Sequence, residues 1–268
     1  MNYLQGAIAA AKRAGKIHKK YFRKGVAVKT KSSSYDLVTT ADTEAEIEVV
    51  SFLKKHWPDH NFICEEHLYQ ETPSEYIWII DPLDGTNNFA CGIALFSVSI
   101  ALKYRNELLL GVVYDTINNE LFYAQKNKGA FLNNKRIRVN DVSHLKQAML
   151  ITGFYYDRGR EMIKTLVAVK RFLSLHVLGI RRFGSAALDL CYVACGRAAG
   201  FWEFELSPWD FAAGKLLVEE AGGKVTDNKG KVVPLTKKHF IVASNGQIDR
   251  QLLEVIEPKH SRIKKSGI

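Results

Sequence analysis

The spacing of apolar residues divides the chain into two parts with different rhythms. In the first part, apolar residues at helical spacing predict an amphipathic helix over residues 2–24, and a second helix is expected over 41–56. From residue 61 the pattern changes to short apolar runs typical of strands, which we expect at 61–64 and 76–81. Two or three further strands are predicted within 95–125, where Phe96 to Leu102 alternate with period two, and turns are predicted at Gly129 and Asn133-Asn134.

After about residue 143, strands and helices alternate, which is typical of α/β layering. The pattern therefore predicts an α/β fold in which an α+β N-terminal half (1–143) precedes an α/β C-terminal half (144–268). The seam between them is soft, because no linker rich in proline or glycine marks it, and 268 residues also fit one large domain. The strands predicted in this half lie at 148–152, 176–180 and 200–204 and near 224 and 241, and the helices lie at 160–173, 185–196 and 208–221.

Composition limits the class of protein. Hydrophobic residues make up 47% and charged residues 25% of the chain, which excludes global disorder. No apolar run approaches the roughly 18 residues of a membrane span, and the N-terminus lacks a signal-peptide pattern. We therefore expect no membrane partner and a cytoplasmic location. The cysteines lack metal-binding spacing and predict reduced thiols; they are Cys64, Cys91, Cys191 and Cys195.

The net charge of +10 originates at the two ends of the chain. Residues 1–35 contain nine lysines and arginines and no acid, and residues 258–268 contain four and no acid. A basic N-terminal helix is compatible with a nucleic-acid or transcription-factor partner. A solvated helix face, or attraction of an anionic substrate, explains the same lysines, and nucleic acid is not expected as the main partner.

The strongest chemical signal is a short acidic turn, residues 81–86, which follows an apolar strand. A β-turn at its start brings the Cα atoms of Asp81 and Asp84 to within about 7 Å, so that both carboxylates can face one point. Gly85 permits a tight backbone path, and Thr86 can begin a short helix whose free N–H groups suit a phosphate. The alternative is an ordinary surface turn, which uses the same residue types.

Two further acidic elements accompany this turn. Glu65-Glu66 closes the strand predicted at 61–64. Asp210 lies in the first turn of the helix that Ser207 and Pro208 begin, where it can also serve simply as a capping acid. Four carboxylates at one place require counter-charge, and oxygen ligands without histidine or cysteine favour Mg²⁺, Mn²⁺ or Ca²⁺. Because two such ions about 4 Å apart promote phosphoryl transfer to water, the residues predict metal-dependent phosphate chemistry.

With these motifs the chain resembles the inositol monophosphatase family, within the lithium-sensitive, magnesium-dependent phosphatase superfamily. The resemblance covers about residues 5 to 255 and implies a layered αβαβα sugar-phosphatase architecture that is usually dimeric. The motifs that carry it are Asp36-Leu37-Val38-Thr39-Thr40-Ala41-Asp42, Cys64-Glu65-Glu66, Asp81-Pro82-Leu83-Asp84-Gly85-Thr86, Gly184-Ser185-Ala186-Ala187, and Pro208-Trp209-Asp210 followed by Glu220-Ala221-Gly222-Gly223.

The resemblance implies two to three Mg²⁺ ions in the active site. One ion would be held by Glu65, Asp81, the Leu83 carbonyl and Thr86, and a third, weaker ion would bind Glu65 through water. The second would be held by Asp84 and Asp210, with Asp81 bridging. The implied catalytic residues are Asp42, Thr86 and Glu65, since Asp42 would pair with the Thr86 hydroxyl to activate the attacking water. An acid at a helix start is the alternative for Asp42.

The resemblance also implies a substrate site. Backbone groups of Gly85 and Thr86 would hold the phosphate, and Glu203 would bind substrate hydroxyls. Lys31 lies in a stretch that forms a flexible lid in relatives, and Cys64 stands where the family usually has glycine; we expect a buried bystander there, with a redox-sensitive thiol as the alternative. The remaining substrate-binding residues implied are Asp210, Gly184, Ser185 and Ala186.

The implied activity is that of an inositol-1-monophosphatase, which hydrolyses myo-inositol monophosphate. A fructose 1,6-bisphosphatase or a 3′(2′),5′-bisphosphate nucleotidase would keep the chemistry and change the substrate. A second phosphate needs additional basic groups, for which surface solubility or ion pairs between subunits is the alternative role. The candidates are Arg158, Arg160, Arg181 and Arg182.

Overall fold

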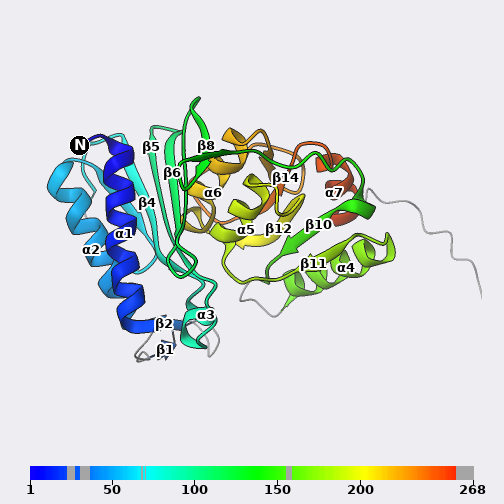
Figure 1. The fold of residues 1–268 in the computed structure, drawn as a ribbon, viewed down its shortest axis with the longest axis horizontal. Helices are drawn as coiled ribbons and strands as arrows, with labels where there is room; N and C mark the ends of the chain where they lie inside the picture. Colours follow the sequence, from blue (N-terminus) through cyan, green and yellow to red (C-terminus); the bar gives the residue numbers. More distant parts are fainter. Residues whose placement is uncertain (23–27, 31–36, 68, 70, 155–158, 258–268) are drawn as a thin grey trace, which may run out of the picture.

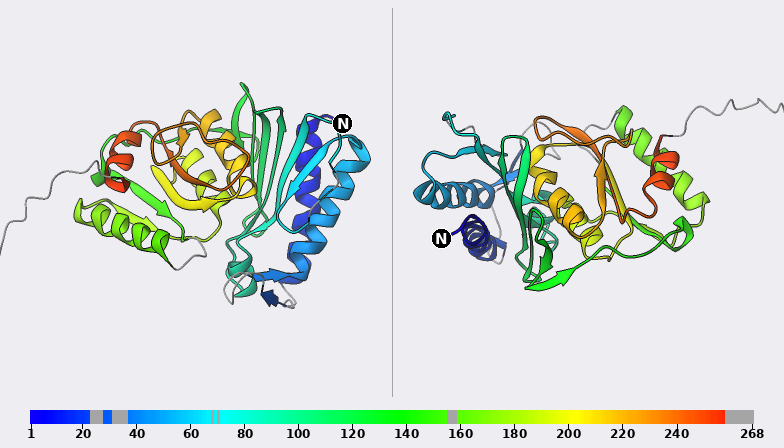
Figure 2. Two further views of the ribbon diagram at one scale, coloured as in Figure 1. Left: turned by 180° about the vertical axis from the view of Figure 1, so that it is seen from behind. Right: turned by 90° about the horizontal axis from the view of Figure 1, so that it is seen from above.

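The structure is a computed structural model, which describes residues 1–22, 28–30, 37–67, 69, 71–154 and 159–257. Its helices and sheets form alternating layers (Figures 1 and 2). This order confirms the predicted α/β fold with its layered αβαβα architecture. The layers are α1 (Tyr3–Phe22) with α2 (Thr40–His56), a seven-stranded sheet, α5 (Ala186–Ala194) with α6 (Pro208–Glu220), a five-stranded sheet, and α4 (Arg160–Ser174) with α7 (Asp249–Ile256).

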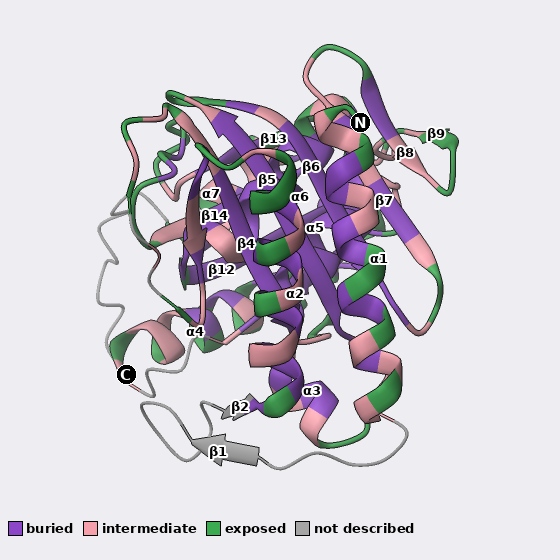
Figure 3. Ribbon diagram, turned by 90° about the vertical axis from the view of Figure 1, so that its left-hand side faces the viewer, coloured by how far each residue is buried: buried purple, intermediate pink, exposed green. Residues whose placement is uncertain are grey.

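The first layer packs closely on its sheet because α1 presents small residues to it. Figure 3 shows the buried side of α1 turned inward and its exposed side turned to solvent. Ala7, Ala10, Ala11 and Ala14 are fully buried. Gly15 permits a still closer approach, since a Cβ atom there would lie 2.7 Å from the Tyr114 ring. The helix predicted over 2–24 is thus present over its described part; residues 23 and 24 lie outside the described residues.

The seven-stranded sheet has the order β3-β4-β5-β6-β7-β8-β9. β3 pairs parallel to β4, and the other neighbours are antiparallel. Three strands occupy the segment predicted to hold two or three, and positive φ angles at Asn133 and Asn134 form the predicted turn. The strand bounds are β3 Asn61–Cys64, β4 Tyr76–Asp84, β5 Ser97–Tyr104, β6 Glu107–Asp115, β7 Glu120–Gln125, β8 Gly129–Leu132 and β9 Lys135–Ile137.

The five-stranded sheet has the order β11-β10-β12-β14-β13. The strand predicted at 176–180 begins later, at Gly179, because His176 takes a positive φ of 56° in the turn after α4. α7 was not predicted, and a short pair, β1 (Val28–Thr30) and β2 (Leu37–Thr39), lies apart from both sheets. The bounds are β10 Met149–Thr152, β11 Gly179–Arg181, β12 Gly200–Leu206, β13 Lys224–Thr226 and β14 His239–Ser244, with a 3₁₀ turn at Leu145–Gln147.

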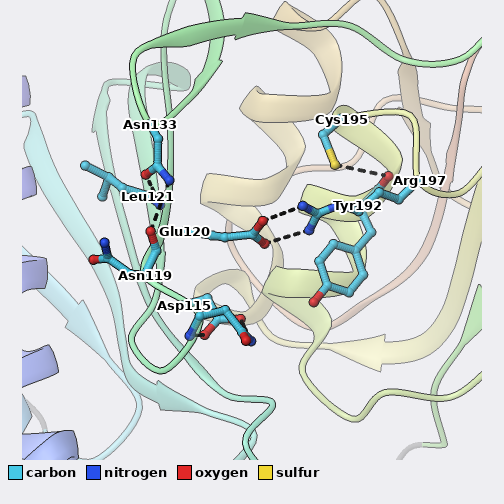
Figure 4. Close-up of polar contacts among 9 residues, drawn as sticks. Asp115, Asn119, Glu120, Leu121, Asn133, Tyr192, Cys195 and Arg197 are labelled. Atoms are coloured by element: carbon cyan, nitrogen blue, oxygen red, sulfur yellow. Dashed lines mark hydrogen bonds and ion pairs between the residues drawn. The ribbon is translucent and has the colours of Figure 1, made fainter.

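The central helices α5 and α6 join the two sheets into one core. Gly111 of β6 lies against α6 so closely that a Cβ atom would be 2.7 Å from the Ala213 carbonyl oxygen. At the rim, Arg197 donates two hydrogen bonds to the Glu120 carboxylate and thereby ties β7 to the segment after α5 (Figure 4). The chain passes from the first sheet to the second between Ile137 and Met149. A division into two domains near residue 143 stays a prediction.

Candidate active site

The acidic turn lies at the end of β4, where the regular pairing with β5 is interrupted. A bulge separates Asp81, which pairs with Ser99, from Asp84, which pairs with Ser97. Both acids are buried. The Asp81 Oδ1 atom accepts a hydrogen bond from the Leu83 N–H at 3.0 Å, as expected for a carboxylate that begins a turn. The strand predicted at 76–81 thus continues to Asp84, and the two carboxylates lie on a bulged strand end where the sequence predicts a β-turn.

Gly85 follows the turn with a φ of +99° and caps the short helix α3 (Thr86–Ala90). A Cβ atom at this position would lie 3.0 Å from the Leu95 carbonyl oxygen and 3.2 Å from that of Gly184. Both the positive φ and the lack of space require glycine here. The backbone can consequently bring Thr86 directly over the turn.

Asp42 and Thr86 are joined, although they are distant in sequence. The Thr86 hydroxyl lies 2.8 Å from Asp42 Oδ1 and 3.0 Å from the Leu83 carbonyl oxygen. Asp42 is fully buried in the first turn of α2, where its Oδ2 atom accepts a hydrogen bond from the Thr39 N–H at 2.8 Å. Asp42 thus caps its helix with one oxygen and contacts Thr86 with the other. Burial raises the pKa of Asp42, against the hydrogen bonds from Thr39 and Thr86.

Asp84 is held by the N-terminus of α5. Its Oδ2 atom accepts hydrogen bonds from the Ser185 hydroxyl at 2.5 Å and from the Ala187 N–H at 2.8 Å, while Ala186 N–H lies 3.3 Å from Oδ1. Ser185 is fully buried and is the N-cap of α5. These contacts connect the acidic turn of the first sheet to the middle layer. They give Ser185 a partner that sequence reasoning did not identify.

Glu65 follows β3, which runs parallel to β4, so both strands end on the same side of the sheet. The two residues after Glu65 are held by Glu46, a fully buried residue of α2. The Glu46 Oε2 atom accepts a hydrogen bond from the Glu66 N–H at 2.9 Å, and Oε1 lies 2.7 Å from His67 Nδ1. Glu46 lies one helical turn after Asp42. This four-residue spacing from Asp42 was the only feature of the sequence that could have indicated a site role for Glu46.

Asp210 begins α6, as predicted, with Ser207 as the N-cap and Pro208 after it. Its Oδ2 atom accepts a hydrogen bond from the Ser207 N–H at 2.7 Å, so Asp210 does cap α6, as one of its two interpretations predicted. The helix start is anchored to the first sheet, because the Ser99 hydroxyl donates to the Trp209 carbonyl at 3.1 Å. Asp210 therefore caps α6, in the central helical layer, and lines the same cavity as Asp81 and Asp84.

The four acids lie around one cavity of about 410 Å³. Burial, followed by repulsion from Glu65 and the other acids, raises the pKa values of Asp81 and Asp210. Burial also raises the pKa of Asp84 to about 6, although its hydrogen bonds from Ser185 and α5 oppose the rise. The other cavity-lining residues are Leu83, Gly85, Thr86, Gly153, Phe154, Arg182, Gly184, Ala186, Glu203, Leu206, Ser207, Trp209 and Lys238.

This donor set fits a hard divalent cation. All of its groups are oxygens, and their mutual repulsion requires a positive charge. Among the described residues, no group of three or more His, Cys, Asp or Glu side chains lies so that it could hold a metal ion by itself. Backbone and hydroxyl oxygens, such as those of Leu83 and Thr86, and water would therefore have to complete the coordination.

Glu203 forms the far wall of the cavity. It is buried on β12 beside Gly153, where a Cβ atom would lie 1.9 Å from Glu203 Oε2. Burial raises the pKa of Glu203 to about 8, partly offset by Arg182. Behind it, Asp189 of α5 is fully buried, and its carboxylate accepts no hydrogen bond from the described residues. Burial and the nearby Glu203 raise its pKa too.

Of the arginine candidates, Arg182 lines the cavity. Arg160 and Arg181 are exposed and do not line it, while Arg158 and the proposed lid residue Lys31 lie outside the described residues. Cys64 is buried, and burial raises the pKa of its thiol, which keeps it protonated. A bystander role is thus favoured over a redox-sensitive one. All four cysteines are free thiols.

The layered fold and an oxygen-lined cavity that receives residues from both sheets are those of a phosphatase. A model of the inositol monophosphatase family matches residues 2–261, and the chain belongs to this family. It is 42% identical over 254 residues to the Nus factor SuhB of Pasteurella multocida, an alignment that covers 94% of each protein.

Solved structures agree with this assignment. The extragenic suppressor protein SuhB of Bartonella henselae superposes with a TM-score of 0.89 at 39% identity, over 96% of this chain and 99% of that one. The IMPase of Thermotoga maritima superposes with a TM-score of 0.87 at 36% identity, over 96% of this chain and 97% of that one. Among the described residues, no helix is both long and apolar enough to span a membrane.

Proposed function

We propose that the chain is a Mg²⁺-dependent phosphomonoesterase that hydrolyses myo-inositol monophosphate. The observation that carries this proposal is the hydrogen bond, 2.8 Å long, from the Thr86 hydroxyl to the buried Asp42. Thr86 lines a cavity together with Asp81, Asp84 and Asp210. A buried base, a hydroxyl and a group of metal-type oxygens are the parts that hydrolysis of a phosphate ester needs.

Two to three Mg²⁺ ions are proposed to occupy the cavity. Glu65, Asp81, the Leu83 carbonyl and Thr86 would hold one, and Asp81, Asp84 and Asp210 another, with a third bound to Glu65 through water. Bound Mg²⁺ would supply the charge that acidifies a water molecule and stabilises the leaving oxygen. A solved relative at 25% identity, an IMPase/NADP phosphatase, is described as complexed with Mg²⁺ and phosphate, which supports this cofactor.

The chain's own residues would position the reactants. With its proton directed to Asp42, the Thr86 hydroxyl can accept a hydrogen bond from the attacking water, and Asp42 can receive the proton that the water loses. Glu65 would assist in orienting this water. Backbone N–H groups of Gly85 and Thr86 would bind the phosphate.

We assign substrate selection to the cavity wall that contains Glu203. Glu203 would accept hydrogen bonds from ring hydroxyls, with Gly184, Ser185, Ala186 and Asp210 beside it. Because the Ser185 hydroxyl donates to Asp84, its contribution would run through the orientation of that carboxylate. Phosphate release from inositol 1-phosphate, with Mg²⁺ and with EDTA, tests the proposal. Equal rates in both conditions would remove it.

A bisphosphate substrate is the second candidate within the same chemistry. Arg182 and Lys238 both line the cavity and could meet a second phosphate. Activity on fructose 1,6-bisphosphate and on a 3′,5′-nucleotide bisphosphate should therefore be measured together with inositol phosphate. If Arg182→Ala selectively loses bisphosphate activity, and that activity is the higher one in the unaltered protein, the bisphosphatase assignment is the better one.

A homodimer is proposed, with the outer face of α4 as its contact surface. This face exposes large apolar side chains, among them Ile163 (58% exposed), Leu166 (49%) and Leu173 (54%), a pattern that favours burial against another surface. Light scattering coupled to size exclusion measures the mass directly. A monomer at micromolar concentration would contradict the dimer.

A transcription partner remains a separate candidate, favoured by one observation. Lys12, Arg13 and Lys16 are exposed on the outer side of α1, and relatives are named Nus factors. Arg13 is already paired with Glu48 at 2.7 Å, which weakens this basic surface. Salt-dependent retention of RNA by the Asp84→Asn protein would support such a role. No retention at low salt would exclude direct RNA binding.

A further inference from the structure

His18 contacts the acidic turn from a helix that supplies no residue to the proposed catalytic set. It lies in the last turns of α1, the end that reaches α3 in Figure 1, and is fully buried. Its ring packs against Phe89 and Phe96, with centroid distances of 5.9 Å and 5.7 Å, and these two rings also contact each other at 4.8 Å. Full burial against this aromatic pair restricts the orientation of the ring.

The two ring nitrogens of His18 have different partners. Nε2 lies 2.9 Å from the Pro82 carbonyl oxygen, and Nδ1 lies 3.4 Å from the Thr116 hydroxyl. A carbonyl oxygen can only accept, so Nε2 must carry the proton and donate it. Nδ1 is then free to accept from Thr116. Burial lowers the pKa of His18 to about 4, which is consistent with a neutral ring.

The contact with Pro82 acts on one particular peptide group. The Pro82 carbonyl and the Leu83 N–H belong to the same planar unit, in which the two groups point in opposite directions. The carbonyl accepts from His18 at 2.9 Å, while the N–H donates to Asp81 Oδ1 at 3.0 Å. A rotation of this peptide would break both hydrogen bonds. His18 and the Asp81 carboxylate are therefore coupled through the rigid, planar Pro82–Leu83 peptide group.

We propose that His18 is a positioning residue for the metal site, which acts by holding the Pro82–Leu83 peptide so that the Asp81 carboxylate keeps its direction. This inference rests on the proposed function, in which Asp81 bridges two ions. Groups that orient metal ligands typically change metal affinity about 10- to 100-fold when they are removed. The same loss is expected here.

The test compares side chains that differ in where they place an N–H donor. His18→Gln can place its amide near the position of Nε2 and keep the bond to Pro82. His18→Asn ends near the position of Nδ1 and cannot reach Pro82, and His18→Leu removes both polar contacts. Mg²⁺ binding to the EDTA-treated full chain is measured by calorimetry, and thermal unfolding is measured in parallel. Ala14→Gly, one turn earlier on the buried side of α1, is the control for a general weakening of the helix.

We expect His18→Leu and His18→Asn to raise the Mg²⁺ dissociation constant at least about tenfold, as for other groups that orient ligands. His18→Gln should stay near the wild-type value, and Ala14→Gly should unfold at a lower temperature with unchanged Mg²⁺ affinity. If His18→Leu does not fold, the comparison of Gln with Asn decides.

Equal Mg²⁺ affinity in Gln and Asn, or a loss of affinity in Ala14→Gly as large as in Asn, would overturn the positioning role. A wild-type protein that binds no Mg²⁺ would instead overturn the proposed function, and the inference with it.

Discussion

Replacing Asp84 by asparagine should abolish activity while leaving the metal-free protein as stable as before, or more stable. A pKa raised from 3.8 to about 6 corresponds to about 3 kcal/mol by which the ionised carboxylate destabilises the folded state at neutral pH. Asparagine removes this charge. The hydrogen bonds from Ser185 and Ala187 already lower this pKa, so their contribution is contained in that figure.

In the absence of metal, the variant should therefore be at least as stable as the wild type. The asparagine oxygen can still accept from Ser185, but its NH₂ group cannot bind a cation. Mg²⁺ should therefore raise the melting temperature of the wild type and have little effect on the variant. Turnover of inositol phosphate should be lost almost completely.

The assay is thermal unfolding in EDTA and in Mg²⁺, together with kcat/KM, and the exposed Asp141→Asn is the control. One kcal/mol corresponds to about 2–4 °C for a protein of this size. A fall of more than about 4 °C in EDTA for Asp84→Asn would refute the expected gain or absence of change in stability. Because the folded-state pKa is raised, the metal-free wild type should also gain stability as the pH falls from about 6 towards 3.8.

Further predictions concern selectivity, positioning and inhibition. Glu203→Ala should reduce kcat/KM for inositol phosphate about tenfold or more beyond its effect on an aryl phosphate; equal losses would assign Glu203 to the metal site. Glu46→Ala removes the buried acceptor of the Glu66 N–H, so it should lower the free energy of unfolding by about 1–3 kcal/mol and weaken activation by Mg²⁺. Denaturant titration measures the first effect, and the Mg²⁺ dependence of the rate measures the second. Li⁺, a hard monovalent cation, should inhibit turnover at millimolar-type concentrations where K⁺ does not, and indifference to Li⁺ would remove that expectation alone.

Local signals explain why much of the site could be read from the sequence. The Gly85 position and the Ser207-Pro208 start of α6 depend on residues within a few positions of one another, and the structure has them as predicted. Residues 81–84 differ, because β4 continues through a bulge to Asp84 where the sequence predicts a β-turn. Helices such as α2 and α6 were recognisable because capping residues and apolar spacing coincide. β11 began later than predicted because the turn at His176 depends on how α4 ends, which apolar spacing does not record.

Long-range partners were not readable in this way. Asp42 and Asp210 had two open interpretations each, as helix caps or as site residues. Both acids cap their helices. Asp42 also binds the Thr86 hydroxyl with its second oxygen, and Asp210 also lines the cavity. His18 looked like one more polar residue in a lysine-rich helix. Its role depends on burial against a turn 64 residues away.

By itself, the sequence determined the fold class, the family and the residue types of the site, because these follow from apolar periodicity, turn chemistry and motifs of a few residues. The tertiary structure alone decided which groups hold those residues in place: Ser185 and α5 on Asp84, Glu46 on the Glu65 turn, and His18 on the peptide beside Asp81. The physical reason is that a buried polar group must find a hydrogen-bond partner wherever packing brings one. These partners lie far apart in the sequence, so neighbouring residues along the chain do not reveal which groups will pair.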